Sequence, residues 1–103
     1  MKKLKKATRG VPKDQVYFLK LYVADNEPNS RIAKENLKSI CDEYLDGRYH
    51  MQEVDALIDF TSALNDKVFV TPTLVLIAPE PKATVIGNLS SKDAVISALR
   101  LRK

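Results

Sequence analysis

Two side chains in this sequence belong to types that could carry chemistry, Cys41 and His50, and each is the only one of its kind in the chain. Dithiol exchange needs two thiols, and a structural zinc ion needs four nitrogen or sulfur ligands. One cysteine and one histidine supply neither set. We therefore expect no intrachain disulfide, no metal site, no cofactor and no catalytic residue, and we predict that the chain is not an enzyme.

The neighbours of both residues favour structural roles. Cys41 belongs to a helical repeat of mostly apolar residues, formed by Ala33, Leu37, Ile40, Cys41 and Tyr44. A free cysteine on such a face behaves as a small hydrophobic residue, and an oxidant sensor is the alternative. His50 lies in a segment of weak alternation, 49–57, which is typical of an edge strand. We expect its side chain at the surface.

The hydrophobic pattern predicts the elements that position these residues. Residues 16–23 are apolar except for Lys20, which predicts a central strand buried on both faces. Turn and capping residues follow over Asp25–Ser30, so a helix should begin at about Asn29 or Ser30. The first unit is therefore a strand, a turn and a helix.

The rest of the chain predicts five more elements. They are the edge strand 49–57 after the first helix ends at Asp46–Gly47, a short irregular helix within 58–69, strands 74–78 and 83–86, and a C-terminal helix. The last helix is expected because Ser90-Ser91-Lys92-Asp93 has the form of an N-cap. The order is β-α-β-α-β-β-α, an α/β fold with a mixed sheet flanked by helices.

Length and composition fit one domain. The chain has 103 residues, 45% of them hydrophobic, which is enough for a single core. Residues 1–14 show no hydrophobic period, so we expect a basic flexible leader followed by one domain over 15–103. No apolar run approaches the roughly 20 residues that a membrane span needs. With a single cysteine, this predicts a cytoplasmic protein in a reducing compartment.

The positive charge is concentrated at the two ends. Of 17 Lys and Arg residues, nine lie in 1–13 or 100–103, whereas the segment 14–99 holds eight of them against all 13 Asp and Glu residues, a net charge of −5. A folded nucleic-acid-binding face would cluster Lys and Arg on one element, so we expect no nucleic acid partner. The basic ends either contact an acidic partner weakly or only solvate the chain.

Three motifs carry a resemblance to a known family. The segments LKLYVADNEPNS at 19–30, TPTL at 71–74 and IGNLS at 86–90 resemble the KaiB family, small partners of the circadian clock ATPase KaiC. The likeness covers about Val16 to Leu101. It implies a thioredoxin-like fold and a non-catalytic regulatory protein that acts on a KaiC-type ATPase, modulating its phosphorylation state or signalling output. A SasA-like kinase or a KaiA-like protein is implied as a further partner, and the resemblance allows a homo-oligomer.

The resemblance also implies site residues. The docking positions carried over from the family are Tyr49, His50, Met51, Gln52 and Lys67. Thioredoxins have their CxxC motif in the turn after the first strand, where this chain has Asp25, Asn26, Pro28 and Asn29 instead. We expect this turn, with Thr71 and Pro72, to act in recognition, or Pro72 to act only as a structural lock. X–Pro bonds are usually trans, but the position of Pro72 in the fold predicts a cis bond.

Some members of the family refold their C-terminal half, and two residues bear on this choice. Ala98 and Arg100 stand where switching members often have a glycine and an acidic residue. Glycine in a helix costs about 0.5–1 kcal/mol relative to alanine, and a cation in the last turn adds about 0.3–1 kcal/mol. We therefore expect the thioredoxin-like form with a C-terminal helix.

Two other functions remain open from the sequence. One is a stress-response thioredoxin-like protein that has lost clock function and KaiC binding, since the acidic C-terminal extension common in the family is replaced by a basic end. The other, a redox enzyme that uses Cys41 alone, ranks last because a dithiol cycle needs a second thiol.

Overall fold

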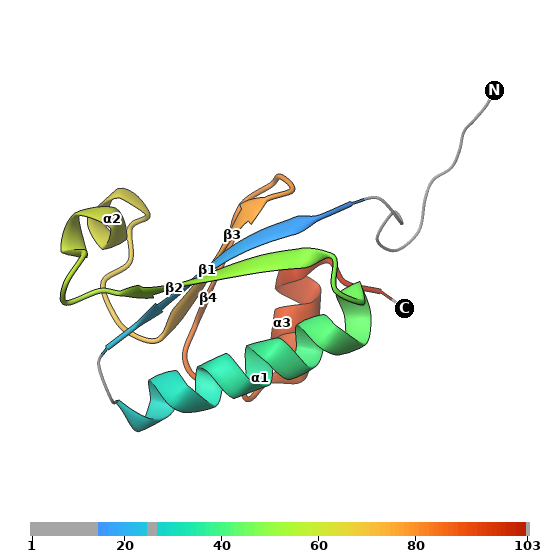
Figure 1. Ribbon diagram of the computed structural model, residues 1–103, viewed down its shortest axis with the longest axis horizontal. Coiled ribbons are helices and arrows are strands. Elements are labelled where there is room, and N and C mark those ends of the chain that lie inside the picture. The colour runs from blue at the N-terminus through green and yellow to red at the C-terminus, as the bar shows by residue number, and fades with distance from the viewer. Residues whose placement is uncertain (1–14, 25–26, 103) are drawn as a thin grey trace.

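The structure is a computed structural model that describes residues 15–24 and 27–102 (Figure 1). Its sheet contains β1 (Tyr17–Val23), β2 (Tyr49–Asp55), β3 (Thr73–Ala78) and β4 (Ala83–Ile86). The strand order is β2-β1-β3-β4, with β1 parallel to β2 and antiparallel to β3, and β3 antiparallel to β4. The predicted mixed sheet with a central first strand and a second strand at its edge is confirmed.

The helices are α1 (Pro28–Leu45), α2 (Phe60–Asn65) and α3 (Lys92–Leu99). The long α1 and the shorter α3 lie on one face of the sheet, and α2 lies at the other face near the carboxyl end of β1 (Figure 1). The element order is β-α-β-α-β-β-α, as predicted.

Successive side chains of β1 point to opposite faces of the sheet, and each face carries its own hydrophobic core. The larger core lies between the sheet and the helices α1 and α3, and includes Leu19, Leu21, Leu37, Cys41 and Leu99. The smaller one lies under α2 and consists of Tyr22, Val54, Ala63, Val68 and Val75. Since α2 spans only six residues, it covers only part of its face of the sheet.

The prediction that the first strand is buried on both faces is wrong at its beginning. The Phe18 side chain is 45% exposed, and Lys20 is only partly buried. Both point to the face that α2 covers, but only Lys20 reaches this helix, because its Nζ donates to Ser62 and to the C-cap Asp66, each at 3.3 Å, and Phe18 lies beyond it. The amino half of β1 therefore has one open face.

The first helix begins earlier than predicted. Its N-cap is Glu27, whose carboxylate accepts a hydrogen bond from the Ser30 backbone N–H at 3.1 Å, and Pro28 is the first helical residue. Proline suits this position because its missing N–H would be unpaired there anyway. Ser30 lies buried inside the first turn. The predicted end at Asp46–Gly47 is confirmed, because Asp46 is a left-handed C-cap with φ of 49°.

Two other element ends differ from prediction. The strand β2 ends at Asp55, whose carboxylate accepts from the Leu57 N–H at 2.9 Å and turns the chain two residues early. The helix α3 ends at Leu99, and Arg100 adopts the left-handed region with φ of 57° instead of continuing the helix. Within the described residues, no helix is both long enough and apolar enough to span a membrane.

Candidate functional site

The outer edge of β2 is the clearest place where this structure can accept a partner. One side of β2 pairs with β1, in a register that sets Phe18 beside His50 and Lys20 beside Gln52. Among the described residues no strand pairs with its other side. An unpaired edge offers a row of backbone N–H and C=O groups to which an extended segment of another protein can bind.

The four predicted docking residues on β2 divide between its two faces. His50 and Gln52 are exposed on the open face, and the His50 ring stacks on Phe18 with 5.1 Å between ring centroids and 18° between planes. Tyr49 and Met51 pack against the larger core instead. The Tyr49 hydroxyl donates to Asp42 of α1 at 2.8 Å. Only two of the four are therefore free to contact a partner with most of their side chain.

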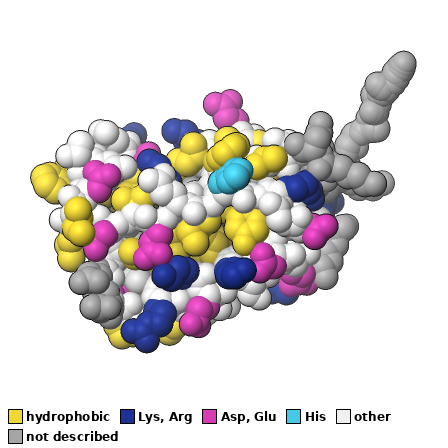
Figure 2. All heavy atoms as spheres, viewed as in Figure 1, with side chains coloured by type: hydrophobic (Ala, Val, Ile, Leu, Met, Phe, Trp, Pro, Cys, Tyr) yellow, Lys and Arg dark blue, Asp and Glu magenta, His cyan; other side chains and the backbone are white. Residues whose placement is uncertain are grey.

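A shallow hollow of about 370 Å³ lies on the open face of the sheet and extends from β2 across β1 to β3. It is lined by Phe18, Leu19, Lys20, His50, Met51, Gln52, Ile77 and Ala78. Figure 2 shows hydrophobic side chains around the single histidine on this face. An apolar or aromatic side chain of a bound segment would fit here, stacking on Phe18 and His50.

Lys67 lies apart from this hollow. It is exposed, follows α2 and has a φ of 59°. It does not line the hollow, so the structure does not join it to the β2 residues. Any partner that contacts both must span α2 and the β2 edge.

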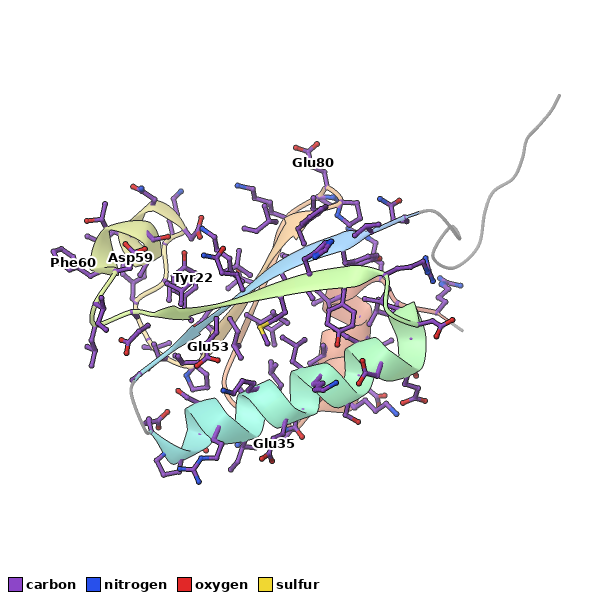
Figure 3. The ribbon with its side chains drawn as sticks, viewed as in Figure 1. Tyr22, Glu35, Glu53, Asp59, Phe60 and Glu80 are labelled. Atoms are coloured by element: carbon purple, nitrogen blue, oxygen red, sulfur yellow. The ribbon has the colours of Figure 1, made fainter. Side chains whose placement is uncertain are left out.

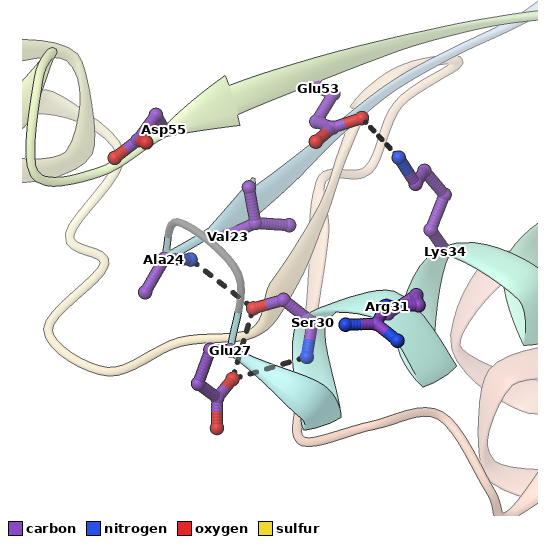
Figure 4. Close-up of a pocket in the computed structure, with 8 residues that line it drawn as sticks. All are labelled: Val23, Ala24, Glu27, Ser30, Arg31, Lys34, Glu53 and Asp55. Atoms are coloured by element: carbon purple, nitrogen blue, oxygen red, sulfur yellow. Dashed lines mark hydrogen bonds and ion pairs between the residues drawn. The ribbon is translucent and has the colours of Figure 1, made fainter.

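The turn after β1 forms a smaller, charged pocket of about 190 Å³ (Figure 4). It is lined by Val23, Ala24, Glu27, Ser30, Arg31, Lys34, Glu53 and Asp55. Lys34 and Glu53 form an ion pair at 2.9 Å, and the Ser30 hydroxyl donates to Glu27 at 3.0 Å and accepts from the Ala24 N–H at 3.2 Å. These hydrogen bonds and this ion pair hold the turn with oxygen and nitrogen atoms, at the place where a thioredoxin has its two cysteine sulfurs.

The other predicted recognition residues are placed as follows. Pro28 and Asn29 are exposed in the first turn of α1, whereas Asp25 and Asn26 lie outside the described residues. The sequence did not single out Arg31, Lys34 or Glu53 for the pocket, because their proximity depends on the parallel pairing of β1 and β2. Within the described part of the chain, no group of His, Cys, Asp and Glu residues is arranged to hold a metal ion.

Pro72 is placed like a structural residue. The Thr71–Pro72 bond is cis, as predicted. Pro72 itself is buried, and its carbonyl accepts a hydrogen bond from the Gly87 N–H at 2.9 Å. The next residue, Thr73, donates its hydroxyl to the Val70 carbonyl at 2.7 Å. With its backbone already engaged, Pro72 fits the structural lock better than a displayed recognition site.

Cys41 is fully buried in the larger core. Burial, assisted by the nearby Asp42 charge, raises the pKa of its thiol to about 12. A thiolate is the nucleophile in disulfide exchange, and at neutral pH this group is protonated and out of reach. The prediction that Cys41 packs as a small hydrophobic residue agrees with this placement.

This placement predicts the outcome of a redox assay. The recombinant protein should not reduce insulin disulfides, and Cys41→Ser should leave that result unchanged. A thiol reagent should label Cys41 in the folded protein far more slowly than in urea, because the reagent can react with the Cys41 thiolate only after the core around it has opened. Catalytic turnover that disappears in Cys41→Ser would contradict the prediction.

Comparison with known sequences decides the family. The sequence model of the KaiB domain matches residues 20–101. The chain belongs to the KaiB family. It is 41% identical over 87 residues to the circadian clock oscillator protein KaiB of Microcystis aeruginosa, covering 84% of each chain. It is also 41% identical over 90 residues to KaiB1 of Synechocystis, covering 87% of this chain and 86% of the relative.

Comparison with solved structures confirms the thioredoxin-like fold. The N-terminal domain of SasA from Synechococcus elongatus aligns with a TM-score of 0.70 at 19% identity, covering 98% of this chain and 97% of that domain. Mitochondrial thioredoxin 3 of Saccharomyces cerevisiae aligns with a TM-score of 0.67 at 16% identity, covering 86% of this chain and 82% of the thioredoxin. This member of the KaiB family thus has the fold of thioredoxins without their pair of cysteines.

Proposed function

We propose that this chain is a non-catalytic regulatory protein that binds a KaiC-type ATPase and modulates its phosphorylation state or signalling output. Its membership of the KaiB family supports this, since similar curated proteins are named circadian clock oscillator proteins. The one observation that carries the binding role is the open edge of β2 beside an apolar hollow. The single, buried cysteine argues in the same direction, against redox catalysis.

The proposed contact combines backbone and side chains. A segment of the ATPase would add to the free edge of β2, where main-chain hydrogen bonds supply affinity. His50, Gln52 and the exposed ring of Phe18 would then select the side chains of that segment. Lys67 would add a charged contact near α2. Tyr49 and Met51 hold the strand in place from the core side.

A SasA-like kinase or a KaiA-like protein is a further proposed partner. An edge strand accepts one added strand at a time, so two partners that both use the β2 edge exclude each other. Competition between such proteins for this chain would therefore accompany the proposed function.

The proposal predicts the effect of a charge change at the docking residues. Gln52→Glu combined with Lys67→Glu should weaken binding to a KaiC-type ATPase about tenfold or more, because it removes a cation and places two carboxylates in the contact. The affinity should be measured by titration with the cognate ATPase, with circular dichroism to verify the fold.

A matched control exists on the opposite side of the sheet. Ser39→Glu in α1 with Arg102→Glu beyond α3 makes the same change in net charge at two exposed positions and should leave affinity unchanged. Equal affinity of the Gln52 and Lys67 variant would place the interface elsewhere. No binding by the unmodified chain would instead favour the stress-response alternative, in which KaiC binding has been lost.

A further inference from the structure

The hollow on the open face of the sheet lies where the chain enters the fold. Phe18 and His50 are each the second residue of their strand, and their exposed rings stack with 5.1 Å between centroids. The leader, residues 1–14, joins the same end of β1. Lys13 precedes Phe18 by five residues, a span of at most about 18 Å. The leader is therefore tethered at the edge of the hollow.

The leader carries a strong positive charge. Its cations are Lys2, Lys3, Lys5, Lys6, Arg9 and Lys13. Against Asp14, its one anion, they give a net charge of +5. Arg48 fixes a further cation where the leader joins, because its guanidinium donates to the Gln15 carbonyl at 3.2 Å. Such a cluster attracts an acidic partner, and the attraction weakens as salt is added.

The hollow itself selects an uncharged side chain. Lys20 is the one Lys, Arg, Asp or Glu residue that lines it, and the Lys20 Nζ already pairs with Asp66 at 3.3 Å. The turn between β3 and β4 carries one anion and one cation, Glu80 and Lys82, both exposed. Glu80 points away from the sheet at the tip of this turn (Figure 3). The hollow thus offers aromatic and apolar contact, and the leader supplies the charge.

Two features of a ligand match this arrangement. One is an aromatic side chain that stacks on Phe18 and His50, and the other is a run of negative charge that meets the leader. Single-stranded nucleic acid has both features. It cannot, however, use the backbone groups along the edge of β2 that no described strand pairs with, and the net charge of −5 over residues 14–99 repels it. An extended peptide pairs with that edge and can confine its carboxylates to the leader end.

We propose that the hollow and the leader together bind an extended acidic segment with one aromatic residue, whose ring enters the hollow while its carboxylates meet the leader. The inference rests on the proposed function for the identity of the partner, and it names the chemistry of the ATPase segment that docks at β2. If the added strand is antiparallel to β2, the carboxylates follow the aromatic residue in its sequence. If it is parallel, they precede that residue.

The test is a titration of the full chain with fluorescent peptides of about ten residues, the length of a long strand. The parent peptide has one phenylalanine in a threonine and valine background, and it is made with four aspartates either before or after that ring. In two matched peptides, alanine replaces the phenylalanine or asparagines replace the aspartates. In about 50 mM salt, the tighter parent should bind at least tenfold more strongly than either matched peptide. The preference for aspartate should shrink at about 300 mM salt, where exposed charges are screened.

Charge reversal in the leader tests its part in the contact. Lys5→Glu with Lys6→Glu should weaken binding of the parent peptide at least tenfold and leave binding of the asparagine peptide unchanged. The matched control is Arg31→Glu with Lys92→Glu, which makes the same change in net charge at exposed positions of α1 and α3, on the other face of the sheet. Its affinity for the parent peptide should equal that of the unmodified chain. The melting temperature of each variant verifies the fold.

Removal of one ring tests the aromatic contact separately. His50→Thr deletes the exposed imidazole and keeps a residue that favours strands. It should weaken binding of the parent peptide about two- to tenfold and leave binding of the alanine peptide unchanged.

Several results would overturn the proposal. They are equal binding of all the peptides, a leader variant that binds the parent peptide like the unmodified chain, and an equal loss of binding in the control on α1 and α3. Tighter binding of an oligouridine of the same length would also overturn it and assign the surface to nucleic acid.

Titration with the ATPase separates this inference from the proposed function. Loss of ATPase affinity in Lys5→Glu with Lys6→Glu supports both. Unchanged affinity in that variant, together with the loss expected for Gln52→Glu with Lys67→Glu, would overturn the inference and leave the proposed function in place. Peptide binding as expected by a chain that does not bind the ATPase would support the acidic and aromatic specificity and contradict the proposed function.

Discussion

Replacing Asp66 with Asn should lower the free energy of unfolding by about 2–3 kcal/mol. Asp66 accepts hydrogen bonds from the Tyr22 hydroxyl and from Lys20 Nζ, the latter at 3.3 Å, and both donors extend from the central strand. The side chains of Lys20 and Asp66 are 26% and 15% exposed. The loss should thus fall between the roughly 1 kcal/mol of surface pairs and the 3–5 kcal/mol of broken buried pairs. Urea denaturation of both proteins measures it.

The matched control is Asp42→Asn. Asp42 also pairs with a lysine and a tyrosine, Lys38 and Tyr49, each at 2.8 Å, but it lies on the exposed surface of α1. Exposed pairs contribute little because water and salt screen them. The urea midpoint of this variant should stay close to that of the unmodified chain. A similar loss in both variants would mean that the position of Asp66 between α2 and the sheet is of no consequence.

The free energies of unfolding of the unmodified chain and of Asp66→Asn should also depend differently on pH in the acid range. Burial opposes ionisation of Asp66, but the hydrogen bonds from Tyr22 and Lys20 outweigh it and lower the pKa of the carboxyl. Because the folded pKa lies below the unfolded value of about 3.9, the stabilisation is present above that pH and lost as the pH falls through the folded pKa. The difference from Asp66→Asn should therefore be constant between about pH 5 and 7 and shrink below about pH 4.

At alkaline pH the stabilisation from this network is lost as the pH rises, the reverse of its loss in acid. Burial and then the hydrogen bond to Asp66 raise the pKa of Tyr22. Burial opposes the charge of Lys20, yet its bonds to Asp66 and Tyr22 outweigh it and raise the pKa of Lys20 as well. Both contributions are present below the unfolded values of about 10 and are lost as the pH rises above them. The network therefore stabilises α2 most across the neutral range.

The elements could be predicted because each is specified locally. Apolar runs, turn residues and the Ser91 cap are short-range signals, and all seven elements follow from them. The open half of β1 could not be predicted from the same pattern. An apolar run has the same sequence pattern whether both faces of the strand are covered by helices or, as beside Phe18, only one face is covered. The length of α2 decides how much of this face of β1 is covered, and the irregular sequence of α2 does not specify that length.

The candidate site was only partly predictable for a related reason. Weak alternation identified β2 as an edge strand, which its place in the sheet confirms. The side on which each β2 residue lies depends on the register with β1. Lys20 was visible as the one polar residue in an apolar run, but its partner lies 46 residues further along the chain. No local pattern joins two residues at that separation.

Removing one hydrogen bond and one helix-favouring residue together should loosen the C-terminal helix more than either change alone. The buried Tyr17 hydroxyl donates to the carbonyl of Leu99, the last residue of α3, at 2.9 Å. Burial raises the pKa of Tyr17, so the phenol stays protonated and remains a donor at neutral pH. Tyr17→Phe removes the donor to a buried carbonyl, at a cost of about 1–2 kcal/mol, and Ala98→Gly costs about 0.5–1 kcal/mol.

The double variant Tyr17→Phe, Ala98→Gly should therefore open α3 more easily by about 2 kcal/mol, which is roughly thirtyfold faster exchange of its protected amide hydrogens. Hydrogen exchange over residues 95–99 measures this, and amides of α1 in the same sample are the internal control. Backbone chemical shifts identify the conformation. An extended strand over 95–99 in the unmodified chain would contradict the expected helical state.

Substitutions at Arg100 separate the two ways in which this residue can act on α3. Its φ of 57° is one that glycine adopts without strain, so Arg100→Gly should stabilise α3 by about 0.5–1 kcal/mol after the entropy of the glycine is taken off. Its positive charge lies beyond the carboxyl end of the helix, and Arg100→Asp should destabilise α3 because an anion there opposes the helix dipole. Slower exchange over 95–99 in Arg100→Gly and faster exchange in Arg100→Asp is the expected pattern. Faster exchange in both would mean that the lost cation outweighs the relieved backbone, and that Arg100 biases the C-terminal conformation mainly through its charge.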